Sequence, residues 1–351
     1  MSAPEQSYRV AVVGATGQVG SVMRLLLRER GFPASEIVPF ASERSAGRTL
    51  DDGSVVQPLT EETIQGFDLA LFSAGGETSK AWAPRFAVAG AVVIDNSSAF
   101  RMDPEVPLVV AEVNPEALDD HRGIVANPNC STMQMVVALK PLHDRAGIER
   151  IVVSTYQAVS GTGKGAVDEL KAQSRAVLDE AGEPAADIYA HRIAFNALPH
   201  AGKFPDGDDH TDEERKLINE TRKILGDQGI RVSPTCVRVP VVNGHSEAVT
   251  LELRKKLSAD EARELLRAAP GVEVVDDPAG ARYPMAIDAD GEDPVYVGRI
   301  REDPGHPRGL ALFVVADNLR KGAALNAVQV AELVCERGLV GAGARAGAPQ
   351  A

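Results

Sequence analysis

The sequence has few cysteines and no paired arrangement of them. Its 351 residues include only Cys130, Cys236 and Cys335. An odd and widely spaced set supplies neither a disulfide framework nor a CxxC pair for a metal ion. Each thiol is therefore either a small core side chain or a reactive group, and no metal site is predicted.

The chain also lacks an excess of basic charge and a long hydrophobic run. Lys and Arg number 37 against 50 Asp and Glu, so the formal net charge is −13. A protein that binds nucleic acid or an anionic membrane needs a basic surface. Apolar runs such as Val106 to Val110 fall far short of the roughly 18 residues that a membrane span needs. Nucleic-acid and membrane partners are therefore not expected, and any anion must bind at a local site.

The start of the chain and the overall composition predict an ordinary globular protein. Residues Met1 to Ser7 have neither the basic start nor the apolar core of a signal peptide, which predicts a cytoplasmic location. Hydrophobic residues make up 44% and charged residues 25%, close to globular averages. At about 150 residues per domain, the length indicates about two domains.

The first part of the chain follows the pattern of a doubly wound α/β domain. Tyr8 to Val13 predicts a strand, Gly14 to Gly20 a turn, and Val19, Val22, Met23 and Leu26 recur at helical spacing. Helix-length segments such as 80–89 alternate with further short apolar runs, at 37–41, 69–73, 92–95, 109–112 and 124–126. This alternation favours a parallel sheet with helices on both faces.

The pattern changes after Cys130. A helical stretch runs toward His143, and longer strand candidates follow at 151–159, 231–242, 248–254, 295–301 and 310–316. They predict a mixed or antiparallel sheet with covering helices, an α+β domain. Residues 199–212 have a loop composition, Thr211 opens a helix, and a final helix covers about 322–337. The predicted domains are 1–130 with about 318–340, then 131–317, and a flexible tail at 341–351.

The loop GATGQVG, from Gly14 to Gly20, combines glycines with a strand before it and a helix after it. That placement brings backbone N–H groups and the positive helix end to a pyrophosphate. The alternative is a tight βα turn with no ligand. Arg44, between Ser42 and Ser45 near the end of the second strand, favours the 2′-phosphate of NADP, while Glu43 keeps NAD possible.

Cys130 stands in the sequence NPNCST, at the start of the predicted helix. A helix N-terminus lowers the pKa of a thiol and enriches the nucleophilic thiolate. The alternative for any cytosolic cysteine is a buried small side chain. Cys236 in a strand and Cys335 in the last helix fit that alternative, whereas Cys130 has polar neighbours.

Several charged residues and one histidine have two interpretations each. His245 lies in a predicted turn between two strands, where it is either a solvated surface group or a base, and Arg238 in the first strand is either a rim charge or an anion ligand. Arg101 and Lys216 are either phosphate ligands or solvated charges. Spacing alone does not decide among these.

Six motifs occur in an order that resembles bacterial aspartate-semialdehyde dehydrogenases over nearly the whole chain. They are GATGQVG at Gly14, NSSAFRMD around Arg101, NPNCST around Cys130, YQAVSGTG from Tyr156, RVPVVNGHS from Arg238 and DNLRKGAA from Asp317. The resemblance implies a Rossmann NADP-binding domain and a second domain for catalysis and dimerisation. It implies a reversible reaction in which NADPH reduces aspartyl 4-phosphate to aspartate 4-semialdehyde with release of inorganic phosphate.

The resemblance also assigns roles to residues, and it places the reaction in the biosynthesis of lysine through diaminopimelate, threonine, methionine and isoleucine. It implies that Cys130 forms an acyl thioester, that His245 is the acid/base and that Gln157 orients the substrate. Arg238 matches the ligand of the α-carboxylate, Glu213 that of the amino group, and Arg101 and Lys216 the phosphate ligands. The matching cofactor contacts are Gly14, Thr16, Gly17, Gln18, Val19, Arg44, Ser45, Ser160, Gly161 and Asn318.

Two other functions remain open at this level, and so does the assembly. The family is typically a homodimer or a dimer of dimers, and the sequence does not decide between them. An N-acetyl-γ-glutamyl-phosphate reductase has a similar fold and thioester chemistry, but typically has Gly before its cysteine, where this chain has Asn129. A non-catalytic NADP-sensing homologue is the other alternative, and the joint presence of Cys130, Gln157, Arg238 and His245 argues against it.

Overall fold

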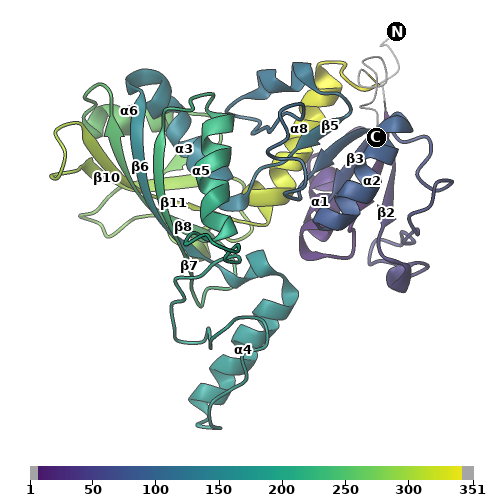
Figure 1. Cartoon of the computed structure of the whole chain (residues 1–351), viewed down its shortest axis with the longest axis horizontal. Coiled ribbons are helices and arrows are strands. Elements are labelled where there is room, and N and C mark those ends of the chain that lie inside the picture. The colour runs from purple at the N-terminus through teal and green to yellow at the C-terminus, as the bar shows by residue number, and fades with distance from the viewer. Residues whose placement is uncertain (1–6, 342–351) are drawn as a thin grey trace. The chain divides into compact units, whose positions relative to one another are not determined.

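The computed structural model describes residues 7–341, which fold into two compact units. The first unit contains residues up to Pro128 and from Ala323 onward, and the second contains Asn129–Gly322. The chain therefore leaves the first unit once and returns to it with its last helix, drawn in yellow in Figure 1.

The first unit is built on a five-stranded parallel sheet with the strand order β2-β1-β3-β4-β5. This confirms the predicted doubly wound sheet. Its elements are β1 (Tyr8–Val13), α1 (Gln18–Glu29), β2 (Ala34–Phe40), η1 (Glu43–Ser45), β3 (Leu69–Phe72), α2 (Gly76–Val88), β4 (Val92–Asp95), η2 (Pro115–Asp120), β5 (Ile124–Ala126) and α8 (Leu325–Glu336).

Alternate residues of the central strands face two separate cores. Val10 and Val12 of β1 pack with residues of α1 and α8, whereas Ala11 and Val13 pack with Phe86 of α2. A strand that is buried on both faces must be apolar throughout. This explains why the inner strands appear in the sequence as short continuous hydrophobic runs.

The predicted strand at 109–112 is wrong. Val109 and Val110 are buried, but the segment meets β5 only at an isolated bridge, where the Val109 N–H donates to the Ala126 carbonyl oxygen (3.1 Å). Asparagine side chains bond to this backbone in place of a longer strand pairing. The Val110 N–H donates to Asn114 Oδ1 (2.9 Å), and Asn326 Nδ2 donates to the Val109 carbonyl (2.9 Å). Apolar composition predicted the burial correctly but could not show where the hydrogen bonds go.

The second unit contains a six-stranded mixed sheet with the order β7-β6-β8-β11-β10-β9, which confirms the predicted mixed sheet. Its elements are α3 (Cys130–Ala146), β6 (Ile148–Gln157), η3 (Val159–Thr162), α4 (Lys164–Leu178), α5 (Asp212–Ile224), β7 (Arg231–Arg238), β8 (His245–Leu253), α6 (Ala259–Arg267), β9 (Val272–Val274), α7 (Ala286–Ala289), β10 (Val295–Glu302), β11 (Gly309–Ala316) and η4 (Arg320–Ala324), which continues into the first unit.

Helix α3 packs against β6, β8 and β11, and α5 packs against α3 and β7 (Figure 1). This arrangement brings the start of α3 and one side of α5 to the same part of the sheet. Two strand boundaries near this part of the sheet differ from the predicted ones. β7 ends at Arg238, four residues before the predicted end, and His245 is the first residue of β8, not part of a turn.

Within residues 7–341, no helix has both the length and the hydrophobicity that a bilayer crossing demands. Of the predicted tail, residues 342–351 lie outside the described part of the chain.

Candidate active site

The glycine loop of the first unit is held by contacts that leave no space for side chains. Gly14 follows β1 with φ of +85°, and a Cβ there would lie 2.3 Å from the Ser73 carbonyl oxygen, just after β3. A Cβ at Gly20 would lie 2.2 Å from the Gly14 oxygen. Since β1 connects to β2 on one side and β3 lies on the other, the loop stands where the strand order reverses. Open α/β sheets bind ligands at that point.

Helix α1 begins at this loop with unpaired polar groups. Its N-cap residue, Gly17, supplies no side-chain hydrogen bond, and Gln18 Oε1 is buried without a partner among residues 7–341. Free N–H groups and a positive helix end suit a phosphate. Arg44 is exposed and Ser45 half-buried in η1, directly after β2. These residues fit a dinucleotide.

Arg101 lies at the carboxyl ends of β4 and β5, in the first unit. Its Nη2 donates to the carbonyl oxygen of Asn96 (2.9 Å), which follows β4, and its Nε donates to that of Asn127 (2.9 Å), which follows β5. The guanidinium is buried and fixed in orientation by these two bonds.

In the second unit, Cys130 is the first residue of α3, as predicted. The Asn129 side chain caps this helix, since its Oδ1 accepts from the N–H groups of Ser131 (3.0 Å) and Thr132 (3.1 Å). A Cβ at Gly322 would lie 2.9 Å from Cys130 Cβ. The thiol-bearing residue therefore sits against a glycine and remains partly exposed.

The other two cysteines fit the buried alternative. Burial and nearby carboxylates raise the pKa of Cys236 far above its ordinary value, and burial raises that of Cys335 to about 12. Neither thiol forms a thiolate readily at neutral pH, so among the three cysteines Cys130 has the position of a nucleophile.

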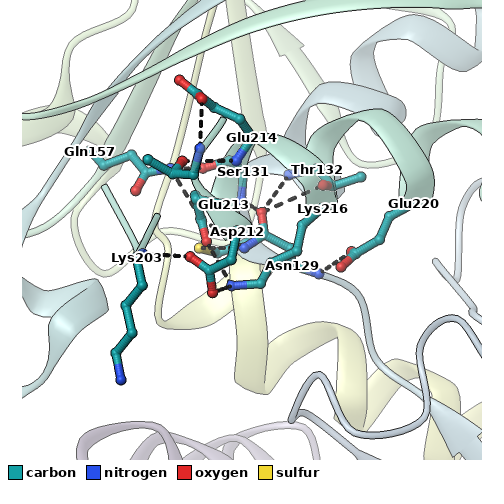
Figure 2. Close-up of polar contacts among 12 residues, drawn as sticks. Asn129, Ser131, Thr132, Gln157, Lys203, Asp212, Glu213, Glu214, Lys216 and Glu220 are labelled. Atoms are coloured by element: carbon teal, nitrogen blue, oxygen red, sulfur yellow. Dashed lines mark hydrogen bonds and ion pairs between the residues drawn. The ribbon is translucent and has the colours of Figure 1, made fainter. Parts of the chain in front are cut away.

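Two buried carboxylates of α5 hold Asn129 from opposite ends (Figure 2). Its backbone N–H donates to Glu220 Oε2 (2.7 Å), and its Nδ2 donates to Glu213 Oε1 (2.8 Å). The same Glu213 oxygen accepts from Gln157 Nε2 (3.2 Å), which also donates to Ser131 Oγ (2.7 Å). Glu213, Gln157 and the start of α3 are therefore one hydrogen-bonded network.

Lys216 joins this network through ion pairs with two carboxylates of α5. Its Nζ lies 3.1 Å from Glu213 Oε2 and 3.1 Å from Asp212 Oδ2. Burial opposes the ionisation of Glu213, but Lys216, Asn129 and Arg238 outweigh it and lower the pKa of Glu213 to about 2. Burial likewise opposes the charge of Lys216, but Glu213 and Asp212 raise its pKa. Both groups are charged at neutral pH.

His245 and Arg238 are held by the backbone of one residue. The Ala158 N–H donates to His245 Nδ1 (3.0 Å), and the Ala158 carbonyl accepts from Arg238 Nη1 (2.6 Å). His245 is fully buried, which excludes the interpretation of this residue as a solvated surface group. Burial together with Arg238 lowers the pKa of His245 to about 3. A Cβ at Gly161 would lie 3.2 Å from His245 Nε2 and 3.4 Å from Arg238 Nη1.

Three polar atoms of this group are buried without a hydrogen-bond partner in the described part of the chain: Gln157 Oε1, Arg238 Nε and His245 Nε2. Buried polar atoms are nearly always paired in proteins. An acceptor, a donor and an imidazole nitrogen left open together indicate the place of a polar ligand.

Ser160 and Asn318, both predicted as cofactor contacts, are hydrogen-bonded to each other (2.8 Å). Asn318 Oδ1 also accepts from the Gly244 N–H (2.9 Å), so this pair supports the segment that leads into His245. The second unit thus contains Cys130, Gln157, Ser160, Gly161, Glu213, Lys216, Arg238, His245 and Asn318, and the first unit contains Arg101, Arg44, Ser45 and the glycine loop with Thr16, Gln18 and Val19.

Sequence reasoning missed three residues of this site: the bridging role of Asn129, the carboxylate of Glu220 and the close approach of Gly322. A signal exists for two of them. Asn directly before a helix is a capping residue, and Glu220 follows Glu213 by seven residues, or two helical turns. Among residues 7–341, no group of three or more His, Cys, Asp or Glu side chains could hold a metal ion.

Comparison with family models places both units in one family. Residues 9–121 match the NAD-binding domain of semialdehyde dehydrogenases, and residues 139–321 match their dimerisation domain. The chain is 57% identical over 339 residues to the aspartate-semialdehyde dehydrogenase of Aquifex aeolicus, covering 95% of this chain and 99% of that protein. The chain belongs to the aspartate-semialdehyde dehydrogenase family. As a member of this family, it is an oxidoreductase with a nicotinamide cofactor.

Solved structures of family members share its fold. The crystal structure of aspartate semialdehyde dehydrogenase II complexed with ASA from Vibrio cholerae matches with a TM-score of 0.90 at 48% identity, covering 95% of this chain and 99% of that one. An aspartate semialdehyde dehydrogenase with NADP from Candida albicans matches with a TM-score of 0.74 at 26% identity, covering 95% and 100%.

Proposed function

We propose that the chain catalyses the reversible, NADP-dependent conversion of L-4-aspartyl phosphate to L-aspartate 4-semialdehyde and inorganic phosphate, through a thioester on Cys130. The observation that carries this proposal is the set of open polar atoms on Gln157, Arg238 and His245, in the same unit as a cysteine that begins a helix. The family's activity accounts for each of these residues.

In the proposed reaction Cys130 Sγ attacks the acyl carbon, and phosphate leaves. A thioester suits the next step because it is reactive toward nucleophiles yet survives until it is reduced. When bound, the reduced nicotinamide supplies the hydride for that reduction. The aldehyde then forms as the bond between carbon and sulfur breaks.

Each charged residue of the site is proposed to bind a different group of the substrate. Arg238 offers a planar guanidinium with a free Nε, which suits the α-carboxylate. Glu213 is ionised and suits the α-ammonium group of the substrate. Gln157, which is hydrogen-bonded to Glu213 and Ser131, is proposed to orient the substrate. Lys216 and Arg101 are proposed to neutralise the phosphate. These local cations explain how a chain with a net charge of −13 accepts an anionic substrate.

For the cofactor we propose NADP. Arg44 and Ser45, exposed or half-buried directly after β2, are placed to meet a 2′-phosphate. Glu43 lies in the same turn and would accept a ribose hydroxyl, so the preference over NAD is proposed to be a matter of degree. The Candida albicans relative, whose structure was solved with NADP, supports this choice.

We also propose a homodimer or homotetramer in the cytoplasm. The match of residues 139–321 to a dimerisation domain supports the assembly. Cys130, Cys236 and Cys335 form no disulfide within residues 7–341, which supports a reducing compartment. Light scattering after gel filtration measures the assembly, and a monomeric mass would contradict it.

The deciding experiment measures NADPH formation from aspartate semialdehyde, with and without inorganic phosphate. Parallel reactions contain N-acetylglutamate semialdehyde as substrate or NAD as cofactor. We expect phosphate-dependent turnover of the aspartate compound alone, faster with NADP. Turnover of only the acetylated compound would identify an N-acetyl-γ-glutamyl-phosphate reductase. Turnover of neither, with NADP still bound, would identify a cofactor-sensing protein.

A further inference from the structure

Glu247 carries a carboxyl group into the interior of the second unit. It is the third residue of β8, fully buried, and stands opposite Thr155 of β6 and Val314 of β11 in the sheet. Neither Oε1 nor Oε2 of Glu247 accepts a hydrogen bond from any residue in the described range 7–341. Buried polar atoms are nearly always paired, so this carboxyl group requires an explanation.

The groups around Glu247 are neutral or negative. Thr155 is beside it on β6, and Cys236 is the neighbour of Thr155 on β7, with a thiol whose pKa burial raises. The Glu213 carboxylate of α5 acts on Glu247 as a like charge, and no cation of the described chain is among the groups that act on it. A buried carboxylate without a compensating charge takes up a proton.

The charge balance of Glu247 is the reverse of that of Glu213. Burial raises the pKa of Glu247 well above its ordinary value, Glu213 raises it further, and Gln134 of α3 opposes both too weakly to prevail. Glu213 is equally buried, but Lys216 and Arg238 lower its pKa. One unit therefore holds two buried glutamates, of which Glu213 is ionised at neutral pH and Glu247 is not.

Gln134 supplies the acceptor that a proton on Glu247 needs. Gln134 is fully buried in α3, and its Nε2 donates to the backbone carbonyl oxygen of His245 at the start of β8 (3.3 Å). Its Oε1 is left without a partner among residues 7–341. A carboxylate cannot donate to that oxygen, whereas a carboxylic acid has one O–H. Protonation of Glu247 thus lets two open groups satisfy each other.

We propose that Glu247 is a protonated carboxylic acid whose O–H donates to Gln134 Oε1 and thereby positions the first turns of α3. Gln134 follows Cys130 by four residues, about one helical turn, so the two lie on the same side of α3. The bonds of Gln134 to Glu247 and to the His245 carbonyl fix this turn to β8. The proposal rests on the proposed function, in which α3 carries the nucleophile. Glu247 acts through Gln134 and is a positioning residue.

Infrared spectroscopy detects the proton directly, because the carbonyl stretch of a carboxylic acid lies apart from the bands of a carboxylate. The measurement is the difference spectrum between the wild type and Glu247→Gln at a pH of about 7, well above the ordinary Glu pKa. We expect a carboxylic-acid band that Glu247→Gln lacks and that the control Glu213→Gln retains. Absence of this band from the wild type would overturn the proposal. The readout requires no turnover, so it holds even if the proposed function fails.

Urea unfolding gives a second readout that is independent of activity. Above its ordinary pKa, Glu247 is ionised in the unfolded chain but protonated in the fold, so unfolding releases a proton and stability falls as the pH rises. Gln keeps a donor for Gln134 and has no proton to lose. We expect Glu247→Gln to unfold at a higher urea midpoint than the wild type at neutral pH, with the difference narrowing toward a pH of about 4. A lower midpoint at neutral pH, as expected for Glu213→Gln, would contradict the proposal.

Kinetics then test the positioning of α3. Glu247→Met keeps the size of the side chain but removes the donor, and we expect kcat to fall about tenfold at an unchanged KM, with kcat rescued in Glu247→Gln. Glu252→Met is the matched control, since Glu252 lies near the far end of β8, paired with Arg150, and should keep normal kcat. Equal losses in the Met and Gln proteins would show that a charged carboxylate is needed. Full kcat in Glu247→Met would show that the O–H does not position α3. Either result refutes the proposal.

Discussion

The two units prepare their sites in opposite ways. In the first unit the glycine loop is shaped by backbone alone: Gly14 and Gly20 are needed because any side chain there would strike a carbonyl oxygen. In the second unit the site is an assembly of side chains, in which Asn129, Glu213 and Lys216 satisfy one another before any ligand arrives. The first kind of site is lost through steric conflict, and the second through an unpaired charge or a missing nucleophile.

The strongest test of the side-chain site is Cys130→Ala. We expect activity to fall on the order of 10³-fold or more, because no other group can form the thioester. The phosphate-dependent assay with aspartate semialdehyde measures this, and circular dichroism checks the fold. Cys335→Ala serves as the matched control and should keep normal turnover, since that thiol is in α8 with a raised pKa. Substantial turnover by Cys130→Ala would refute the thioester route.

The corresponding test of the backbone site is Gly14→Ala. Its Cβ would lie 2.3 Å from the Ser73 oxygen at a φ of +85°, so β1 and β3 must shift. We expect NADPH binding to weaken about 10²-fold, in line with the cost of overpacking. Gly31→Ala is the control: its φ is +62°, but nothing lies within 4 Å of the added Cβ. Fluorescence titration with NADPH compares the two variants. Equal Kd values would show that the contact between the added Cβ and the Ser73 oxygen does not weaken NADPH binding.

The sequence predicted local features well wherever neighbouring residues determine them. The strand Tyr8–Val13 and the start of α5 after Thr211 are as predicted, because hydrophobic runs and capping residues act within a few positions. The family resemblance supplied the site residues. The burial of His245 and the bridge through Asn129 could not be predicted, since their partners, Ala158 and Glu220, lie 87 and 91 residues away.

The charged pair of the second unit predicts an acid-dependent stability. Glu213 has a folded pKa of about 2 against an ordinary 4.5, so its ionisation stabilises the fold above pH 4.5. That contribution is lost as the pH falls toward 2. We expect Glu213→Gln to lose about 2 kcal/mol of unfolding free energy at neutral pH, with the difference from the wild type narrowing below pH 4.5. Urea unfolding across this range measures it. Glu264→Gln, exposed on α6, is the control, and a pH-independent difference would contradict the prediction.

Gly161→Ala would show whether the second unit also depends on backbone space. Here the added Cβ would lie 3.2 Å from His245 Nε2, a contact that a small ring rotation can relieve. The rotation lengthens the bond from the Ala158 N–H, so we expect kcat to fall about tenfold while thermal stability changes little. Gly165→Ala adds a Cβ 3.5 Å from Ile188, an ordinary contact, and should leave kcat unchanged. If both variants keep full activity, the opening beside Nε2 is wider than the reaction requires, and the side chains alone define this site.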